Sequence, residues 1–485
     1  MSELILRLAD GTLIALPPSR QTISTYVLLE QEAWFEKEWG FVPRLLKPGM
    51  TVIDIGANVG VYSLALARAL GGSGAVYAYE PASAPRALLE RSCGLNGLHN
   101  LQVAAAALSD STRQGHLVYG GSSELHMLGA TGEGETISVT ALDEEDRVRN
   151  WRAPDFVKID AEGEEIRILE GGRNFFAQHS PLVMFEVKAG ADLNREAIER
   201  FAAYGYAILR LLPVASMLVP VGLDDPVDTF ELNLFAAKPD RLAALTPDIL
   251  LAQHALNWAP DDFARGLALE AIYAHAFGVP MRELSPPPLT SSYRDALAGY
   301  ALWRSPTALW RSPTASPSTR YAALRFSYAT LRALCVADPT LPRISTLARA
   351  AWDLGERDAC LEALNRILAL AGKTGELKEP FWPANPRFDT IPLGRDIGQW
   401  FFTAILEQLE RTAQFSSMFA QPSINLEWLS NQSLVATEML RRHMLRRLRV
   451  GQRLVVPERL CRPAPDHINA DVWRAGLVPN TVRLQ

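Results

Sequence analysis

The sequence predicts a doubly wound, mostly parallel α/β sheet in its first half and an all-α region after it. Up to about residue 238, short apolar runs alternate with amphipathic segments, a pattern typical of repeated strand–helix units. From about residue 241 the strand-like runs stop, and apolar residues recur at helical spacing instead. A chain of 485 residues is long enough for two or three domains.

The composition is that of a globular chain with a large core. Hydrophobic residues make up 48% of the chain and charged residues 21%, and the formal net charge of −6 gives no basic footprint for nucleic acid. The four cysteines are scattered, which favours a reducing compartment over a disulfide framework or zinc site. The N-terminus does not look like a signal peptide, and no apolar run approaches the roughly 20 residues of a membrane span. We therefore expect a cytoplasmic protein without a transmembrane segment.

The first unit of the sheet predicts a ligand site. Residues 51–55 form a β-branched, apolar run that suits a buried parallel strand. Gly56 allows a sharp turn, and residues 61–70 have the pattern of a helix, which Gly71 and Gly72 end. In open α/β sheets, ligands bind beyond the carboxyl ends of the strands, against helix N-termini.

An acid at the end of the second strand indicates which ligand to expect. Residues 75–79 form this strand, and Glu80 follows it, where a carboxylate can accept both hydroxyls of a ribose. The turn after the first strand lacks the Gly-x-Gly-x-x-Gly pattern that brings backbone close to a pyrophosphate. It carries Asp54 instead, which suits a cationic amino group. A nucleoside with a cationic amino-acid tail is S-adenosylmethionine.

With these features the chain resembles the class I S-adenosylmethionine-dependent methyltransferases, and within them the FkbM family. The resemblance spans roughly residues 25–238 and implies a Rossmann-like sheet and transfer of a methyl group to a hydroxyl, often of a sugar. It is carried by five motifs in the family's order: Val52–Gly60, Tyr79–Pro81, Val139–Asp143, Phe156–Glu165 and Phe185–Val187. The residues that we expect to bind the cofactor are Asp54, Gly56, Ala57, Asn58, Gly60, Glu80, Pro81 and Asp110.

The other elements of the first half follow from the same alternation. A hairpin over residues 1–23 and a helix over 24–46 precede the first strand, and the resemblance implies that such a helix often closes over the cofactor. A Gly-, Ser- and Thr-rich stretch over 111–135 predicts a hairpin or mobile loop, with His116 and His126 as candidate bases. Further strands are expected at 101–106, 156–160, 182–186, 206–212 and 230–238, and further helices at 84–96, 163–169 and 194–204.

Four residues are candidates for catalysis. Asp160 and Glu186 end the fourth and fifth strands, which this fold places side by side, and Glu162 follows two residues after Asp160. They could act as base or hydroxyl clamp, or together hold a hard cation such as magnesium. Lys158 shares a strand face with Asp160 and could neutralise Asp160 or Asp54. The alternative is that Asp160 holds the amino end of the cofactor and Glu162 caps the next helix.

The second half predicts helices interrupted by a Pro-rich zone. Within that zone Ala301–Thr307 is repeated directly as Ala308–Thr314, and the prolines favour a mobile loop. Residues 320–372 resemble a tetratricopeptide-type hairpin in part, and an ordinary helical bundle fits equally well. Six arginines at 440–453 indicate a solvated basic helix face or a site for an anionic partner. The expected division is 1–240, a helical connection at 241–284, the loop at 285–319 and a helical domain at 320–485.

Three functions compete on these grounds. The first is an S-adenosylmethionine-dependent O-methyltransferase acting on a small-molecule or glycan hydroxyl. The second is a helical-repeat module that recruits a protein partner, or a second copy, beside a non-catalytic methyltransferase-like domain. The third, a nucleotide-sugar or dinucleotide enzyme, is disfavoured by the missing glycine pattern.

Overall fold

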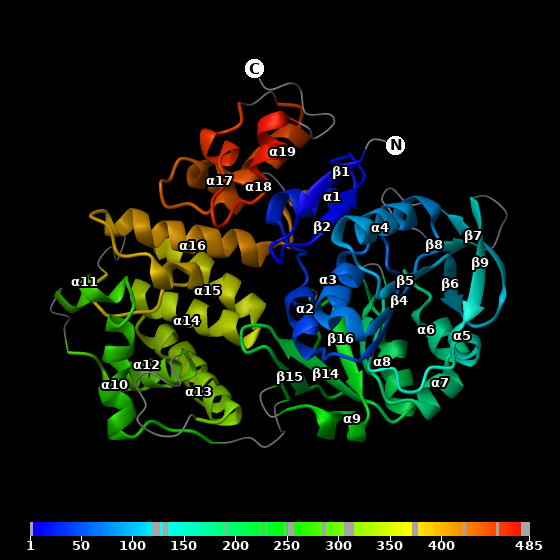
Figure 1. The fold of residues 1–485 in the computed structure, drawn as a ribbon. Helices are drawn as coiled ribbons and strands as arrows, with labels where there is room; N and C mark the ends of the chain where they lie inside the picture. The colour runs from blue at the N-terminus through cyan, green and yellow to red at the C-terminus, as the bar shows by residue number, and fades with distance from the viewer. Residues whose placement is uncertain are drawn as a thin grey trace.

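The computed structural model describes most of the chain. The described ranges are 3–118, 127–129, 134–189, 192–223, 225–228, 230–246, 249–250, 257–283, 288–304, 315–370, 377–420, 423–452 and 455–476. Figure 1 shows an α/β half, blue to green, beside a helical half, green to red.

An eight-stranded sheet organises the first half, in the order β15-β14-β16-β11-β10-β3-β4-β5. The five strands from β11 to β5 are parallel, whereas β16 pairs antiparallel with β11, and β14 with β16. The doubly wound, mostly parallel prediction is therefore correct. The bounds are β3 Thr51–Ile55, β4 Ala75–Tyr79, β5 Leu101–Ala104, β10 Phe156–Ile159, β11 Leu182–Glu186, β14 Ala207–Leu212, β15 Met217–Pro220 and β16 Asn233–Ala237.

The strands are apolar on both faces because helices cover both. Val52, Phe156 and Met184 belong to one buried cluster, while their neighbours Ile53 and Val157 belong to the other, as the two-residue period of a strand requires. The helices of this half are α1 Ile23–Gln31, α2 Lys37–Phe41, α3 Val61–Leu70, α4 Ser83–Asn96, α5 Leu142–Arg149, α6 Glu165–Gly171, α7 Arg173–Gln178, α8 Arg195–Ala203 and α9 Pro239–Ala244.

Smaller sheets complete this half. The predicted N-terminal hairpin is present, and four described strands between residues 106 and 141 form a second sheet in the order β6-β9-β7-β8. His126 of that stretch lies outside the described residues. The strands are β1 Leu4–Arg7, β2 Leu13–Leu16, β6 Ala106–Ser109, β7 Arg113–Val118, β8 Met127–Gly129, β9 Glu135–Ala141, β12 Lys188–Ala189 and β13 Asp192–Leu193.

After residue 240 the described chain is helical, as predicted. Helices α12 to α16 pack in sequence, each against the next, and α17 packs on both α16 and α18. The helices are α10 Asp262–Tyr273, α11 Gly278–Glu283, α12 Ser291–Arg304, α13 Pro317–Ala337, α14 Leu341–Leu354, α15 Arg357–Leu370, α16 Ile397–Ala413, α17 Ile424–Ser430, α18 Thr437–Arg449 and α19 Ala470–Ala475.

Three sequence expectations need correction. The helix expected over 24–46 is broken between α1 and α2, where Glu32 adopts a left-handed backbone (φ 58°). Residues 291–304 of the expected mobile loop form α12, which buries Tyr293 and Trp303, because the prolines of that zone lie outside this helix. The second copy of the tandem repeat lies outside the described residues. In the arginine-rich segment Arg441 and Arg442 are 2% exposed, so the face that they occupy is not solvated.

Candidate functional site

The turn after β3 is fixed by its neighbours on both sides. The backbone N–H groups of Gly56 and Ala57 both donate to the carbonyl of Tyr79, at 3.1 and 3.0 Å. Gly56 has φ +80°, and a Cβ placed there would lie 1.7 Å from the backbone oxygen of Asp160. Glycine is therefore required because the ends of β3 and β10 approach too closely for any side chain.

Gly60 lies where α3 packs closely against α4. It precedes α3 with φ +91°, and a Cβ there would lie 2.2 Å from Leu89 Cδ1 on α4. It does not line the pocket described below. Its place in the motif thus follows from the close packing of α3 and α4.

A pocket of about 970 Å³, part of it open to solvent, lies at the carboxyl ends of β3, β4 and β10. The strand register brings these ends together, because Ile55 lies opposite both Tyr79 and Ile159. Nine of the twelve predicted site residues line it: Asp54, Gly56, Ala57, Asn58, Glu80, Pro81, Lys158, Asp160 and Glu162. Gly60, Asp110 and Glu186 do not.

Glu80 is 7% exposed and is held by two backbone donors. Its Oε2 accepts from the N–H of Asn58 at 2.7 Å, and its Oε1 from the N–H of Ala82 at 2.8 Å. Burial raises the pKa of this carboxyl to about 7. Each oxygen keeps further acceptor capacity toward the pocket, so the ionised form can take hydroxyl donors.

A buried cation lies between two acids at the base of the pocket. Lys158 Nζ is 2.7 Å from Asp160 Oδ2 and 3.8 Å from Asp54 Oδ1, and it lies 5.1 Å from the ring centre of Tyr62. The side chain of Lys158 is 3% exposed and that of Asp160 28%. Although burial opposes it, the charges of Asp160 and Asp54 raise the pKa of Lys158, so the ammonium stays charged.

Two buried oxygen atoms in this pocket accept no hydrogen bond from the described residues. One is Asp54 Oδ1, whose partner oxygen Oδ2 accepts from Ser63 Oγ at 2.5 Å; the other is Asn58 Oδ1. Buried acceptors without donors are costly, so a ligand that brings donors would be favoured here. An ammonium and ribose hydroxyls are such donors, and the residues present therefore fit S-adenosylmethionine.

Glu186 differs from the other predicted acids in the size of its pKa shift and lies outside the pocket lining. Burial, together with the charges of Asp160 and Glu162, raises its pKa to about 10. It is therefore protonated at neutral pH and can donate a hydrogen bond. Asp160 is partly exposed in the pocket, so its carboxylate can reach an acceptor hydroxyl.

The sequence interpretation missed an acid that enters from the broken helix. Glu36 Oε2 accepts from Tyr62 OH at 2.7 Å and from Asn233 Nδ2 at 2.9 Å, and its Oε1 accepts from Trp34 Nε1 at 3.0 Å. Burial and then the charge of Asp160 raise the pKa of Glu36. No motif marked this residue, because its neighbours come from three separate segments of the chain.

The apolar end of the pocket is formed by two strands of the smaller, four-stranded sheet. Ala106, Ala107 and Leu108 of β6 line it together with Leu117 of β7. Asp110, predicted to contact the cofactor, lies past this wall and pairs with Arg113 at 2.5 Å, with 42% of its side chain exposed. His116 does not line the pocket.

In the described ranges no three His, Cys, Asp or Glu side chains are grouped so that they could hold a metal ion, so the magnesium hypothesis rests on the sequence alone. No helix of the described chain is both long and apolar enough to cross a bilayer.

Residues 54–208, about a third of the chain, match the model of the Methyltransferase FkbM domain. No curated protein matches. Among solved structures, the chain is similar to methyltransferase FkbM from Methylobacillus flagellatus KT, with 19% identity, a TM-score of 0.28, and 39% of this chain and 44% of that one covered. It is also similar to a SAM-dependent O-methyltransferase from Thermotoga maritima, with 18% identity, a TM-score of 0.26, and 48% and 77% covered. The chain thus spans less than half of the first of these proteins.

Proposed function

We propose, from the premise that residues 54–208 form a methyltransferase FkbM domain, that this protein transfers a methyl group from S-adenosylmethionine to an acceptor hydroxyl. The expected acceptor is a sugar of a glycan or of a glycosylated natural product. One observation carries the proposal. Buried acceptor oxygens of Asp54, Asn58 and Glu80, at the ends of two adjacent strands, line a single pocket.

The residues take separate roles in this proposal. Asp54 binds the ammonium of the cofactor, and Glu80 accepts the ribose hydroxyls. The cofactor, when bound, supplies an electrophilic methyl group, and the protein aligns the acceptor oxygen with it. Asp160 takes the hydroxyl proton while Lys158 holds its carboxylate in place. Glu186 does not line the pocket and has no direct contact with the acceptor in this proposal.

Calorimetric titration with S-adenosylhomocysteine tests the proposal. We expect 1:1 binding to the wild-type protein, and a loss of about 1–3 kcal/mol in Glu80→Ala, since paired polar groups are then left unmatched. Circular dichroism checks that the variant is folded. A folded wild-type protein that does not bind would contradict the proposal and favour the alternative, in which the helical half recruits a partner and the first half is non-catalytic.

The pKa of Glu80 predicts how binding depends on pH. Ribose hydroxyls donate to the carboxylate, so binding requires the ionised form. With a pKa of about 7, this form is lost as the pH falls, and affinity should be about tenfold lower at pH 6 than at pH 8. Asp54, whose pKa burial also raises, adds to the same trend. Titrations between pH 5.5 and 8.5 measure this; equal pH dependence in Glu80→Gln would exclude Glu80 as its source.

The helical half offers weaker support for a second function, binding of a protein partner or of a second copy of the chain. Phe419, Ile424 and Trp428 expose apolar surface at and just before α17, with Ile424 85% exposed. In this second candidate function, a protein partner or a second copy of the chain covers this surface. The partial resemblance of residues 320–372 to a tetratricopeptide hairpin also favours binding of a protein partner.

A further inference from the structure

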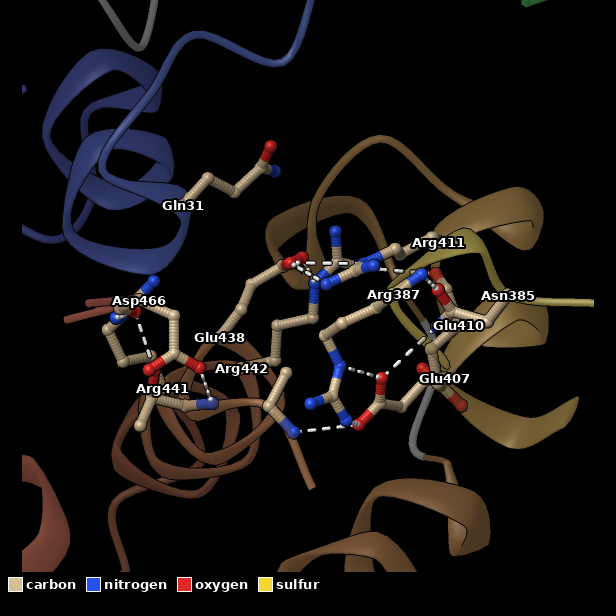
Figure 2. A network of polar contacts seen from close by, with 12 residues as sticks. Gln31, Asn385, Arg387, Glu407, Glu410, Arg411, Glu438, Arg441, Arg442 and Asp466 are labelled. Atoms are coloured by element: carbon tan, nitrogen blue, oxygen red, sulfur yellow. Dashed lines mark hydrogen bonds and ion pairs between the residues drawn. The ribbon is translucent and has the colours of Figure 1, made fainter. Parts of the chain in front are cut away.

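Helix α18 of the helical half is joined to α1 of the α/β half by buried charges. Arg442 Nε lies 3.4 Å from Glu30 Oε1 and 3.0 Å from Glu438 Oε1, and the side chains of Arg442 and Glu30 are 3% and 0% exposed. Arg441 Nε donates to the carbonyl of Glu30 at 2.6 Å. Figure 2 shows Arg442 beside Glu438 and Arg441 beside Asp466, with Gln31 of α1 above them in this view. Removing one member of such a pair leaves the other charge uncompensated.

Arg441, which contacts Glu30, also contacts Glu32, the residue that follows α1. Glu32 has a left-handed backbone that residues other than glycine rarely adopt. Its carboxylate accepts from the N–H groups of Ile468 and Asn469, each at 2.9 Å, and its Oε2 lies 3.3 Å from Arg441 Nη1. Partners that are distant in sequence thus fix the direction in which the chain leaves α1.

Phe415, just after α16, packs directly against Phe35 in the segment that follows α1. Its ring centre lies 5.2 Å from that of Phe35 and 4.6 Å from that of Phe230. Its carbonyl accepts from Gln31 Nε2 at 2.6 Å and from Arg442 Nη2 at 3.3 Å. The helical half therefore holds both ends of residues 32–36.

This segment is part of the candidate active site. Trp34 lines the pocket, and Glu36 bonds to Tyr62 and Asn233. Tyr62 lies against Lys158, whose partner is Asp160. Contacts made around α18 are thus linked to the catalytic candidates through one five-residue connection.

We propose that Arg442, through α1, and Phe415, through its ring contact with Phe35, are positioning residues: they hold residues 32–36 so that Trp34 lines the cofactor pocket, and the helical half is required for a formed site. This inference rests on the proposed function. It predicts that loosening the contacts weakens cofactor binding from a distance, since a pre-formed site pays less to order itself.

The test compares Arg442→Met with Arg387→Met. Arg387 makes a similar pair with buried Glu407 at 2.7 Å, but inside the helical half (Figure 2). We expect Arg442→Met to bind S-adenosylhomocysteine at least about tenfold more weakly and to exchange the amide hydrogens of 32–36 faster, whereas Arg387→Met stays within about twofold of the wild type. Arg442→Lys should recover part of the affinity, because it restores the charge.

Phe415→Ala keeps the ion pairs and removes the ring contacts with Phe35 and Phe230, so it decides the question if Arg442→Met does not fold. Wild-type affinity and wild-type exchange at 32–36 in folded Arg442→Met and in Phe415→Ala would overturn the inference. Equal losses in Arg387→Met would overturn it as well, because they would show a general loss of stability. Failure of the wild-type protein to bind S-adenosylhomocysteine would instead count against the proposed function, and exchange at 32–36 without ligand would still report on the segment.

Discussion

Gly56→Ala is expected to abolish S-adenosylhomocysteine binding and to lower the free energy of unfolding by about 3–5 kcal/mol. The added Cβ would lie 1.7 Å from the backbone oxygen of Asp160, where no flexible side chain can move aside. Its positive φ of +80° adds strain for any residue with a Cβ. Relief requires β3 and β10 to separate at their carboxyl ends, which would displace Asp54 and Asp160. Urea unfolding and calorimetry measure the two effects.

Gly94→Ala is the matched control for this substitution. Gly94 lies within α4, and nothing lies within 4 Å of a Cβ placed there. Alanine in a helix should leave stability unchanged or raise it by up to about 1 kcal/mol, with unaltered binding. A Gly56→Ala protein as stable as Gly94→Ala, with unaltered affinity, would show that the close approach of the two strands is not required.

Lys158→Met should lower the free energy of unfolding by about 3–5 kcal/mol at pH 8, because it leaves buried acids without their cation. Asp54 is fully buried and Asp160 is 2.7 Å from the ammonium, so both lose a charge partner. Methionine is of similar length, so little of the effect would come from a cavity. Methyl transfer should be lost as well, since Asp160 would no longer be held beside the acceptor.

The pH dependence of that loss has a definite sign. Burial already raises the pKa of Asp54, and Lys158 is the charge that opposes this. Without it the folded-state pKa rises further above the unfolded value. Because a raised carboxyl binds its proton more tightly in the folded state, stability is retained at low pH and lost as the pH rises through the folded pKa. Lys158→Met should therefore approach wild-type stability near pH 5 and fall below it toward pH 8.

The double variant Lys158→Met/Asp160→Asn provides the control. Removing the second charge together with the first should recover part of the lost stability, since fewer uncompensated charges stay buried. Methyl transfer should not return. If the double variant is less stable than Lys158→Met by the full cost of Asp160→Asn alone, the two side chains are not coupled.

Sequence alone determined much of the pocket, because its residues sit at marked positions of a repeated pattern. Strand, glycine turn and helix fixed Asp54 and Gly56, and the acid after the next strand fixed Glu80. Parallel strands carry their carboxyl ends to the same edge, so residues far apart in the chain could be placed together without coordinates. That these residues bind the cofactor stays a prediction.

Only the tertiary structure showed which side chains meet at this edge and which contacts the helical half makes with residues 30–36. The break at Glu32 and the entry of Glu36 depend on Arg441, Asn469 and Asn233, which lie from 197 to 437 residues further along the chain. The arginine run of 440–453 predicted either a solvated face or a site for an anionic partner, because sequence periodicity does not reveal which partner a charged face meets. Local pattern specifies a strand and the turn that follows it, but burial of a charge depends on the long-range packing that brings its counter-charge into place.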